Sequence, residues 1–271
     1  ESVADMIRPA LSSTALIGAD VHTVLDVAAA AGCSSVEWTD DGFLEPGDSA
    51  AAGNLMFATL KAGLCTASYA TLFRAGLHGR SAFDKALSTA RELNAPIVRL
   101  WAAPRRSSPE TDADALVSIA RSLGDAAGSR GVTLCFGLSA DSILDTAANA
   151  AAILSRIDHP FIKLAWSPVP GAGFDATMDS LTALSGRLGM AVIRSADLAG
   201  PASAAGKDGD RMEAWLQYLD VLDEQGGNPD MSRYVVIRSL ASCGDGDLAS
   251  SVRDIDAWSV SLRQHHKRRI L

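Results

Sequence analysis

The fold is decided by the stretch Gly32-Cys-Ser-Ser-Val-Glu-Trp-Thr-Asp-Asp-Gly-Phe-Leu-Glu-Pro-Gly-Asp48. An Ala-rich helical run precedes this stretch, and a second one follows it. A short strand, Val36–Trp38, carries Glu37 and ends in a loop rich in Gly, Pro and carboxylates. In a parallel barrel, this arrangement delivers an acidic side chain from a strand end to the rim of a pocket.

The same alternation of strand and helix continues along the 271 residues. Such regular alternation predicts a parallel sheet with right-handed crossovers. An open Rossmann-type sheet is the alternative, but no Gly-x-Gly-x-x-Gly follows the first strand. We therefore expect an α/β fold, a single (β/α)8 TIM barrel, as one domain over residues 1–271. Its strands are expected at Leu11–Ile17, Val36–Trp38, Leu64–Ala70, Pro96–Trp101, Val132–Leu138, Phe161–Trp166, Met190–Ser195 and Tyr234–Leu240.

Each expected strand precedes an expected helix. The helices are predicted at Thr23–Ala31, Ser49–Ala62, Ala82–Leu93, Ala113–Ala127, Ile143–Arg156, Asp175–Arg187, Arg211–Glu224 and Ala249–Leu262. The longest segment without periodicity is Asp197–Gly209, which follows the seventh strand. Loops at that end of a barrel strand serve as lids in many barrels.

The composition narrows the class of protein. Hydrophobic residues make up 48% of the chain and charged residues 21%, as in folded globular proteins. The net charge of −8 argues against a nucleic-acid partner. No apolar stretch approaches the ~20 residues that cross a bilayer. Four widely spaced cysteines, without a Cys-x-x-Cys motif, predict reduced thiols and a cytoplasmic location.

Several further stretches carry a family resemblance. They are Ala67-Ser-Tyr-Ala-Thr-Leu-Phe-Arg-Ala-Gly76, Ala95-Pro-Ile-Val-Arg-Leu-Trp-Ala102, Ser142-Ile-Leu-Asp-Thr146 and Trp166-Ser-Pro168. Together with Glu37-Trp38 and Pro46-Gly-Asp48, they resemble the strand ends of the xylose-isomerase-like sugar phosphate isomerase/epimerase family. The resemblance implies a TIM barrel and proton-transfer chemistry on a small molecule.

The resemblance also implies a divalent metal held by carboxylates and imidazoles at the strand ends. In this sequence the corresponding places are taken by Phe43, Gly137, Ser139 and Arg238, and the seventh strand reads Val192-Ile-Arg-Ser195 without a histidine. Metal ions of this kind prefer oxygen and nitrogen ligands. We therefore expect a divergent relative with no metal and no other cofactor.

Three arginines stand at expected strand ends instead: Arg99, Arg194 and Arg238. Alternation along the fourth strand puts Ile97, Arg99 and Trp101 on one face, which we expect to face the barrel interior. A guanidinium group binds carboxylate or phosphate with a planar fork, so the three side chains are candidates for binding an anionic substrate. The alternative is a structural network with the nearby carboxylates.

The carboxylates after the second strand are the catalytic candidates. Burial of Glu37 beside Trp38 could raise its pKa toward neutrality and make it a general acid or base. A salt bridge to Arg99 is the alternative for Glu37. Asp40 and Asp41 are catalytic candidates too, or residues that form an Asx turn before Gly42.

Aromatic side chains complete the set of substrate-binding candidates. Tyr69 ends the expected third strand and could bond a ligand or simply pack, whereas Trp101 and Trp166 end their strands and could form an apolar wall. Lys163 lies inside the sixth strand, on the face opposite Trp166, so the two side chains cannot both line the pocket.

Two functions remain open from the sequence. The first is a metal-independent isomerase or epimerase-like enzyme that acts on an anionic small molecule in a specialised biosynthetic pathway. The second is a ligand-binding pseudoenzyme, or the silent subunit of a complex with an active paralogue. A homodimer is a further possible assembly.

Overall fold

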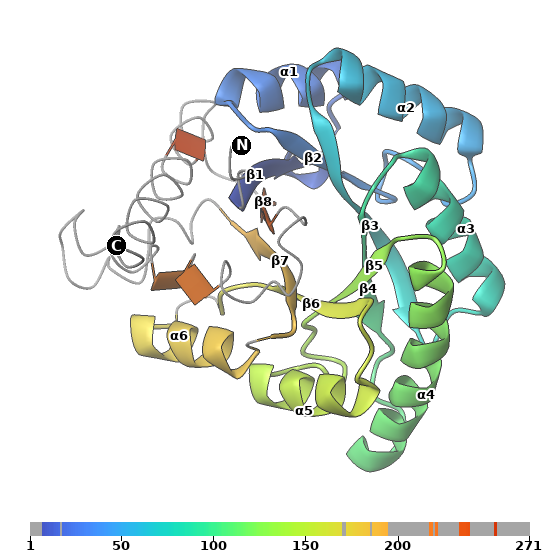
Figure 1. Cartoon of the computed structure of the whole chain (residues 1–271), viewed down its shortest axis with the longest axis vertical. Helices are drawn as coiled ribbons and strands as arrows, with labels where there is room; N and C mark the ends of the chain where they lie inside the picture. The colour runs from blue at the N-terminus through green and yellow to red at the C-terminus, as the bar shows by residue number, and fades with distance from the viewer. Residues whose placement is uncertain are drawn as a thin grey trace, which may run out of the picture.

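The computed structural model describes residues 7–16, 18–169, 172–184, 186–194, 217–218, 220–221, 233–238 and 252–253. Within them, eight parallel strands form a closed barrel in chain order, and β8 pairs with β1 to close it. Helices cover the outside of the barrel (Figure 1). The expected TIM-barrel fold is confirmed. The strands are β1 (Ile7–Ser12), β2 (Ser35–Thr39), β3 (Cys65–Ala75), β4 (Ile97–Ala102), β5 (Thr133–Gly137), β6 (Ile162–Trp166), β7 (Leu188–Ile193) and β8 (Arg233–Ile237).

Six α-helices have described bounds, and most begin at a side-chain cap. Asp20, Asp48, Ser108 and Thr146 each accept a hydrogen bond from the backbone N–H three residues on. The helices expected at Arg211–Glu224 and Ala249–Leu262, and the expected lid Asp197–Gly209, fall largely or wholly outside the described residues. The helices are α1 (Val21–Ala31), α2 (Ser49–Lys61), α3 (Arg80–Glu92), α4 (Pro109–Gly128), α5 (Ala147–Ile157) and α6 (Phe174–Ala183).

The first strand lies earlier than expected. β1 spans Ile7–Ser12 rather than Leu11–Ile17, because its pairing with β8 begins at Ile7. The chain then turns through a short 3-10 helix, η1 (Ser13–Leu16). The hydroxyl groups of Ser13 and Thr39 lie 3.1 Å apart and hold this turn against the end of β2. The turn therefore belongs to the rim of the barrel and not to the sheet.

Other boundaries also differ from expectation, among them the end of β3 and the start of α5. β3 continues to Ala75 rather than ending at Ala70, because its pairing with β4 resumes after a register shift between Ala70 and Arg74. α5 begins at Ala147 rather than Ile143 because Thr146 caps it, and the segment before it forms a turn in which Ser139 N–H donates to the Leu144 carbonyl. Both differences lengthen the structure at the carboxyl ends of the strands.

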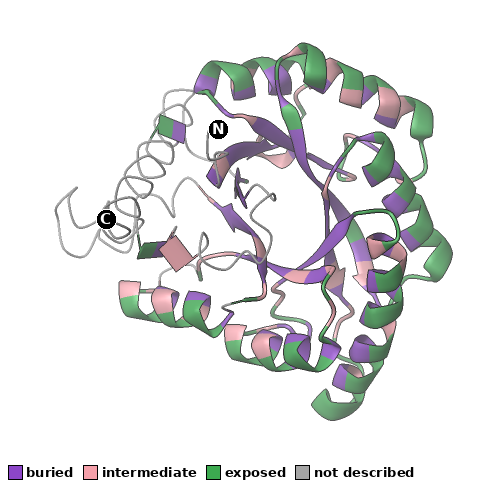
Figure 2. Ribbon diagram, viewed as in Figure 1, coloured by how far each residue is buried: buried purple, intermediate pink, exposed green. Residues whose placement is uncertain are grey.

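The alternation of side chains along the strands separates two apolar layers. The layer inside the barrel contains mainly small or slender side chains, among them Ala10, Ala67, Ala165 and Val192. The layer between strands and helices contains the large ones, among them Trp38, Tyr69 and Trp166. The strands are buried, while the helices turn exposed faces outward (Figure 2). Small interior residues leave room for polar side chains at the carboxyl end.

Among the described residues, no helix combines the length and the apolar character that crossing a membrane requires.

Candidate functional site

A cavity of about 470 Å³ opens at the carboxyl ends of the strands. Its lining comes from residues of β4, β5, β6 and β7 and from residues that follow β1, β2, β5, β6, β7 and β8. This is the end of a TIM barrel where active sites lie. The polar lining residues are Thr14, Asp41, Arg99, Ser167, Arg194 and Arg238, and the others are Trp101, Gly137, Leu138, Ala165, Pro168, Val192 and Ile193. All three arginines singled out in the sequence therefore line one cavity.

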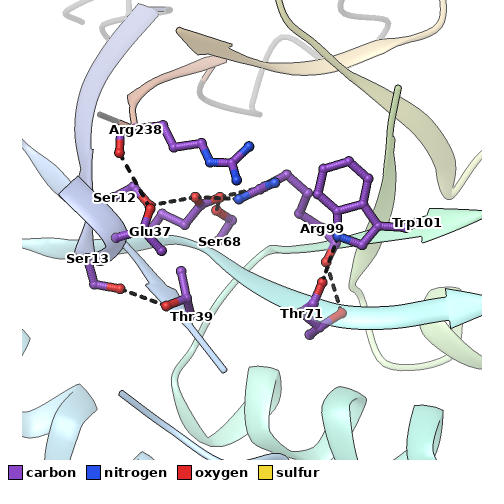
Figure 3. Close-up of polar contacts among 10 residues, drawn as sticks. Ser12, Ser13, Glu37, Thr39, Ser68, Thr71, Arg99, Trp101 and Arg238 are labelled. Carbon is purple, nitrogen blue, oxygen red and sulfur yellow. Dashed lines mark hydrogen bonds and ion pairs between the residues drawn. The ribbon is translucent and has the colours of Figure 1, made fainter. Parts of the chain in front are cut away.

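A buried ion pair lies beneath the cavity. Arg99 Nη2 is 2.9 Å from Glu37 Oε1, and Arg99 Nε donates to Glu37 Oε2 at 3.1 Å. The Ser12 hydroxyl donates to Oε1 at 3.0 Å, and the Ser68 hydroxyl donates to Oε2 at 2.8 Å (Figure 3). The Glu37 side chain is fully buried, and 6% of the Arg99 side chain is exposed. Both carboxylate oxygens are thus occupied by donors from β1, β3 and β4.

This environment keeps Glu37 ionised. Burial alone would raise its pKa, but the Arg99 charge and the hydrogen bonds from Arg99, Ser68 and Ser12 outweigh burial and lower it. The expectation that burial beside Trp38 raises the Glu37 pKa is therefore wrong, and the alternative of a salt bridge is confirmed. Trp38 points to the other face of β2, where its Nε1 donates to Thr59 Oγ1 on α2 at 3.1 Å. Glu37 is also absent from the cavity lining.

Trp101 holds the other side of Arg99. The Arg99 guanidinium carbon lies 5.6 Å from the centre of the Trp101 ring, and Trp101 Nε1 donates to the Thr71 carbonyl at 3.0 Å. A Cβ atom on Gly137 would come within 2.6 Å of the Trp101 ring. The indole therefore fills the space into which a β5 side chain would point. The expected inward direction of Arg99 and Trp101 is confirmed.

Arg238 follows β8 and reaches toward the Glu37–Arg99 pair (Figure 3). Its backbone is fixed, because its N–H donates to the Ile193 carbonyl at 2.8 Å. Partial burial lowers the pKa of Arg238, and the Arg99 charge lowers it further, against the opposing charges of Glu37 and Asp41. Within the described part of the chain, no carboxylate forms an ion pair with its guanidinium group. Arg238 thus presents a positive charge to the cavity.

The two aspartates after β2 differ in position. Asp41 lines the cavity, whereas the Asp40 carboxylate accepts a hydrogen bond from Leu72 N–H on β3 at 2.8 Å and does not line it. Burial raises the pKa of Asp40, and the adjacent Asp41 charge raises it further, although the bond from Leu72 opposes this. Asp40 therefore anchors the end of β2 to β3, and Asp41 is the carboxylate that faces the cavity.

Two of the expected substrate-binding residues lie elsewhere. The Tyr69 hydroxyl donates to the Leu44 carbonyl at 2.8 Å, and Trp166 Nε1 donates to Ser180 Oγ on α6 at 3.1 Å. Both side chains are fully buried in the layer between strands and helices. The expectation that they contact a ligand is corrected, because their positions along β3 and β6 turn them outward. Lys163 faces the opposite direction from Trp166, as expected, but its Nζ donates to the Gly186 carbonyl before β7, at the far end of the barrel.

Some functional positions were not singled out in the sequence. Ser12 and Ser68 are the register partners of Glu37 on β1 and β3, so a correct strand register would have identified them. The expected first strand, Leu11–Ile17, put Ser12 near its start, whereas Ser12 ends β1 and pairs there with Glu37. Thr14 and Leu138 line the cavity from segments that follow strands, and no local signal marks such residues.

The residues that the structure describes at the strand ends do not fit the divalent metal that the resemblance implies. Glu37 already pairs with Arg99, Ser139 donates a hydrogen bond to Asp141, and Gly137 and Arg238 offer no suitable ligand atom. Among the described residues, no group of three or more His, Cys, Asp or Glu side chains is placed to hold a metal ion. A divalent cation would also lie beside three guanidinium groups, and their positive charges would repel it.

Comparison with known proteins gives similarity in fold. No family model and no curated protein sequence matches the chain. An L-ribulose 3-epimerase structure superposes with a TM-score of 0.70 at 15% identity, covering 97% of each chain. The IOLI protein with a bound zinc atom gives 0.67 at 13% identity, covering 94% of this chain and 98% of that one. A xylose isomerase domain protein from Alicyclobacillus acidocaldarius gives 0.65 at 14% identity, covering 93% and 99%. The resemblance to xylose-isomerase-like barrels is confirmed at the level of the fold.

The ion pair generates a stability prediction. Glu37→Gln and Arg99→Met should each lower the free energy of unfolding by about 3 to 5 kcal/mol, because each leaves an uncompensated buried charge or donor. The double variant should lose less than the sum of the single losses, since neither charge remains. Urea unfolding at pH 7 measures all three variants. Additive losses would contradict a direct interaction.

The same pair predicts how stability depends on pH. The folded-state pKa of Glu37 lies below the ordinary value of 4.5, so the stabilisation is complete above that pH and is lost as the pH falls through the folded pKa. The stability difference between wild type and Glu37→Gln should therefore shrink in acid. Asp84→Asn, which breaks the exposed Arg80–Asp84 pair, is the control and should cost at most about 1 kcal/mol.

Proposed function

We propose that this protein is an isomerase or epimerase-like enzyme that acts without a metal ion on a small anionic molecule, in a specialised biosynthetic pathway. The observation that carries the proposal is the positive charge that Arg238 presents to the cavity beside Arg99 and Arg194. The fold supports the class of reaction only as an analogy, because one fold hosts many functions. The L-ribulose 3-epimerase with a similar fold is one example of that class.

The arginines have a chemical role in this proposal. Their N–H groups bind the carboxylate or phosphate of the substrate, and a fixed guanidinium stabilises the negative charge of an enolate as it forms. Arg99 suits the second task because Glu37 and Trp101 fix its position on two sides. Arg238 suits the first, since no described carboxylate pairs with it.

Proton transfer is assigned to Asp41. Among the described lining residues it is the one carboxylate, and a carboxylate can take a proton from carbon and return it. Glu37 is not the base in this proposal, because all its contacts are internal and its pKa is lowered. Glu37 instead positions Arg99, and Asp40 holds the segment that carries Asp41.

A non-catalytic binding protein is the second candidate. The specific observation in its favour is that the inherited strand-end carboxylate, Glu37, is committed to an ion pair. A barrel that binds an anion without transforming it needs the arginines and no base. Such a protein could also act as the silent subunit beside an active paralogue, or as a homodimer.

The proposal predicts independence from metal ions. Elemental analysis of the purified protein should find no stoichiometric Mn, Zn or Mg. A chelator should change neither its melting temperature nor its affinity for anions, because the strand ends present guanidinium groups where ligands would be needed. About one such ion per chain, lost together with thermal stability on chelation, would refute metal independence.

The positive cavity predicts stabilisation by anions. Acetate or inorganic phosphate at a hundred times its Kd should stabilise the folded state by about 2.7 kcal/mol, measured as a rise in melting temperature. Arg238→Met should abolish this rise, whereas Arg80→Met on the surface of α3 should keep it. If Arg238→Met unfolds the protein, Arg238→Lys tests whether charge alone restores binding. An unchanged response in a folded Arg238→Met variant would show that the anion binds elsewhere.

The assignment of Asp41 predicts a kinetic effect. Asp41→Asn should lower the rate of solvent-deuterium incorporation into a substrate by about 10² or more, because a general base is lost. Binding should stay within about an order of magnitude. Mass spectrometry on a panel of 2-oxo carboxylates and sugar phosphates supplies the measurement.

The rate of solvent-deuterium incorporation in Glu37→Gln is compared with the rate in Asp41→Asn. A full rate in Asp41→Asn would remove Asp41 from the chemistry. Clear anion binding without deuterium exchange in any compound would favour the non-catalytic protein.

A further inference from the structure

Hydroxyl groups connect the cavity to the buried ion pair. Thr14 lies in η1 directly after β1, is half-buried, and lines the cavity. Its Oγ1 is 2.9 Å from the hydroxyl oxygen of Ser12, the last residue of β1. The Ser12 hydroxyl in turn donates to Glu37 Oε1 at 3.0 Å (Figure 3). A chain of hydrogen-bonding groups therefore runs from the cavity lining to the carboxylate.

The hydrogen atoms of this chain can point in only one direction. Glu37 is ionised beside Arg99, and a carboxylate only accepts hydrogen bonds. The single hydrogen of the Ser12 hydroxyl is directed to Glu37, so Ser12 has none left for Thr14. Two hydroxyl oxygens 2.9 Å apart need a hydrogen between them, and only Thr14 can supply it.

The Arg238 carbonyl is the other acceptor near Thr14, at 3.5 Å from Oγ1. That distance is long for an O–H···O bond, which ordinarily spans about 2.5 to 3.0 Å. A hydrogen directed there would also leave the oxygens of Ser12 and Thr14 facing each other with lone pairs only. The Thr14 hydrogen is thus committed within the protein, and Thr14 Oγ1 has only lone pairs to offer to a ligand.

On the basis of the proposed function, we propose that Thr14 determines substrate specificity by accepting a hydrogen bond from a substrate hydroxyl, and that the substrate is a hydroxy carboxylate. The carboxylate lies at Arg238 and the hydroxyl at Thr14, two residues that are close to each other at the rim. A keto oxygen in place of the hydroxyl would face the Thr14 oxygen with no hydrogen between them. An ammonium group could donate, but its charge would be repelled by the Arg238 side chain in the same cavity.

Propionate, pyruvate and the two enantiomers of lactate test this proposal. These monoanions share a three-carbon chain and differ at carbon 2, which carries only hydrogens, a keto oxygen or a hydroxyl. We expect one lactate enantiomer to bind about fivefold more tightly than propionate, the effect of one hydrogen bond, and pyruvate to bind no more tightly than propionate. The rise in melting temperature with ligand concentration gives each dissociation constant.

Variants at Thr14 test the assignment to this residue. Thr14→Val has nearly the same shape without the hydroxyl, so lactate should fall to the affinity of propionate while propionate is unchanged. Thr14→Ser keeps the hydroxyl and should keep the preference for lactate. Thr182→Val on the exposed face of α6 is the matched control and should change neither affinity.

Ser12→Ala tests the direction of the hydrogen bonds. Without the Ser12 oxygen, Thr14 can turn its hydrogen toward a ligand, so pyruvate should gain about fivefold relative to propionate. The ratio of the two affinities is measured within one variant, so a general loss of stability does not affect it. A purely structural role of Thr14 predicts an unchanged ratio.

The outcomes separate this proposal from the proposed function. If both lactate enantiomers bind like propionate and all of this binding is lost in Arg238→Met, the hydroxyl site is overturned while the anion site stands. A lactate preference that persists in Thr14→Val would assign the hydroxyl to another acceptor, such as Asp41, and overturn the role of Thr14. If Thr14→Val does not fold, an unchanged ratio in Ser12→Ala would overturn it instead. Failure of every anion to bind would overturn the proposed function itself.

Discussion

The ion pair between Glu37 and Arg99 is the interaction on which the candidate site depends. A carboxylate with no exposed surface is costly to ionise unless donors surround it, and here two hydroxyls and a guanidinium occupy both of its oxygens. The donors come from β1, β3 and β4, so the pair exists only when these strands close around β2. In return, the pair holds Arg99 in one orientation beneath the cavity. The site is therefore built into the barrel interior and does not depend on a mobile loop for its floor.

Fixing Arg99 in this way shapes the rest of the cavity. Trp101 packs over the guanidinium and takes the space that Gly137 leaves on β5. A larger residue at Gly137 would displace the indole, so the glycine and the tryptophan are complementary. The indole then lines the cavity together with Arg238 and Asp41. Because Gly137 at the end of β5 has no side chain, the Trp101 indole of β4 can occupy that space and form part of the cavity surface.

Prediction from the sequence succeeded where the repeat of strand and helix carries the signal. The number and order of the strands follow from the alternation of strand and helix along the chain. The inward direction of Arg99 and Trp101 follows from the alternation of side chains along β4. Tyr69 and Trp166 were misjudged, because an aromatic residue near a strand end suits either face equally well. The first strand was misplaced since Leu11 begins an apolar run that continues into η1, and only pairing with β8 shows where the strand starts. That error hid Ser12 as a partner of Glu37.

By itself, the sequence determined the parallel barrel and the positions of three arginines near strand ends. These properties depend on local periodicity and on the chemistry of single side chains. Only the tertiary structure decided that Glu37 is a fixed partner of Arg99, and that Asp41 faces the cavity while Asp40 does not. The physical reason is that a side chain's pKa and accessibility depend on neighbours brought in from other strands, and the register between those strands is set by closure of the whole barrel.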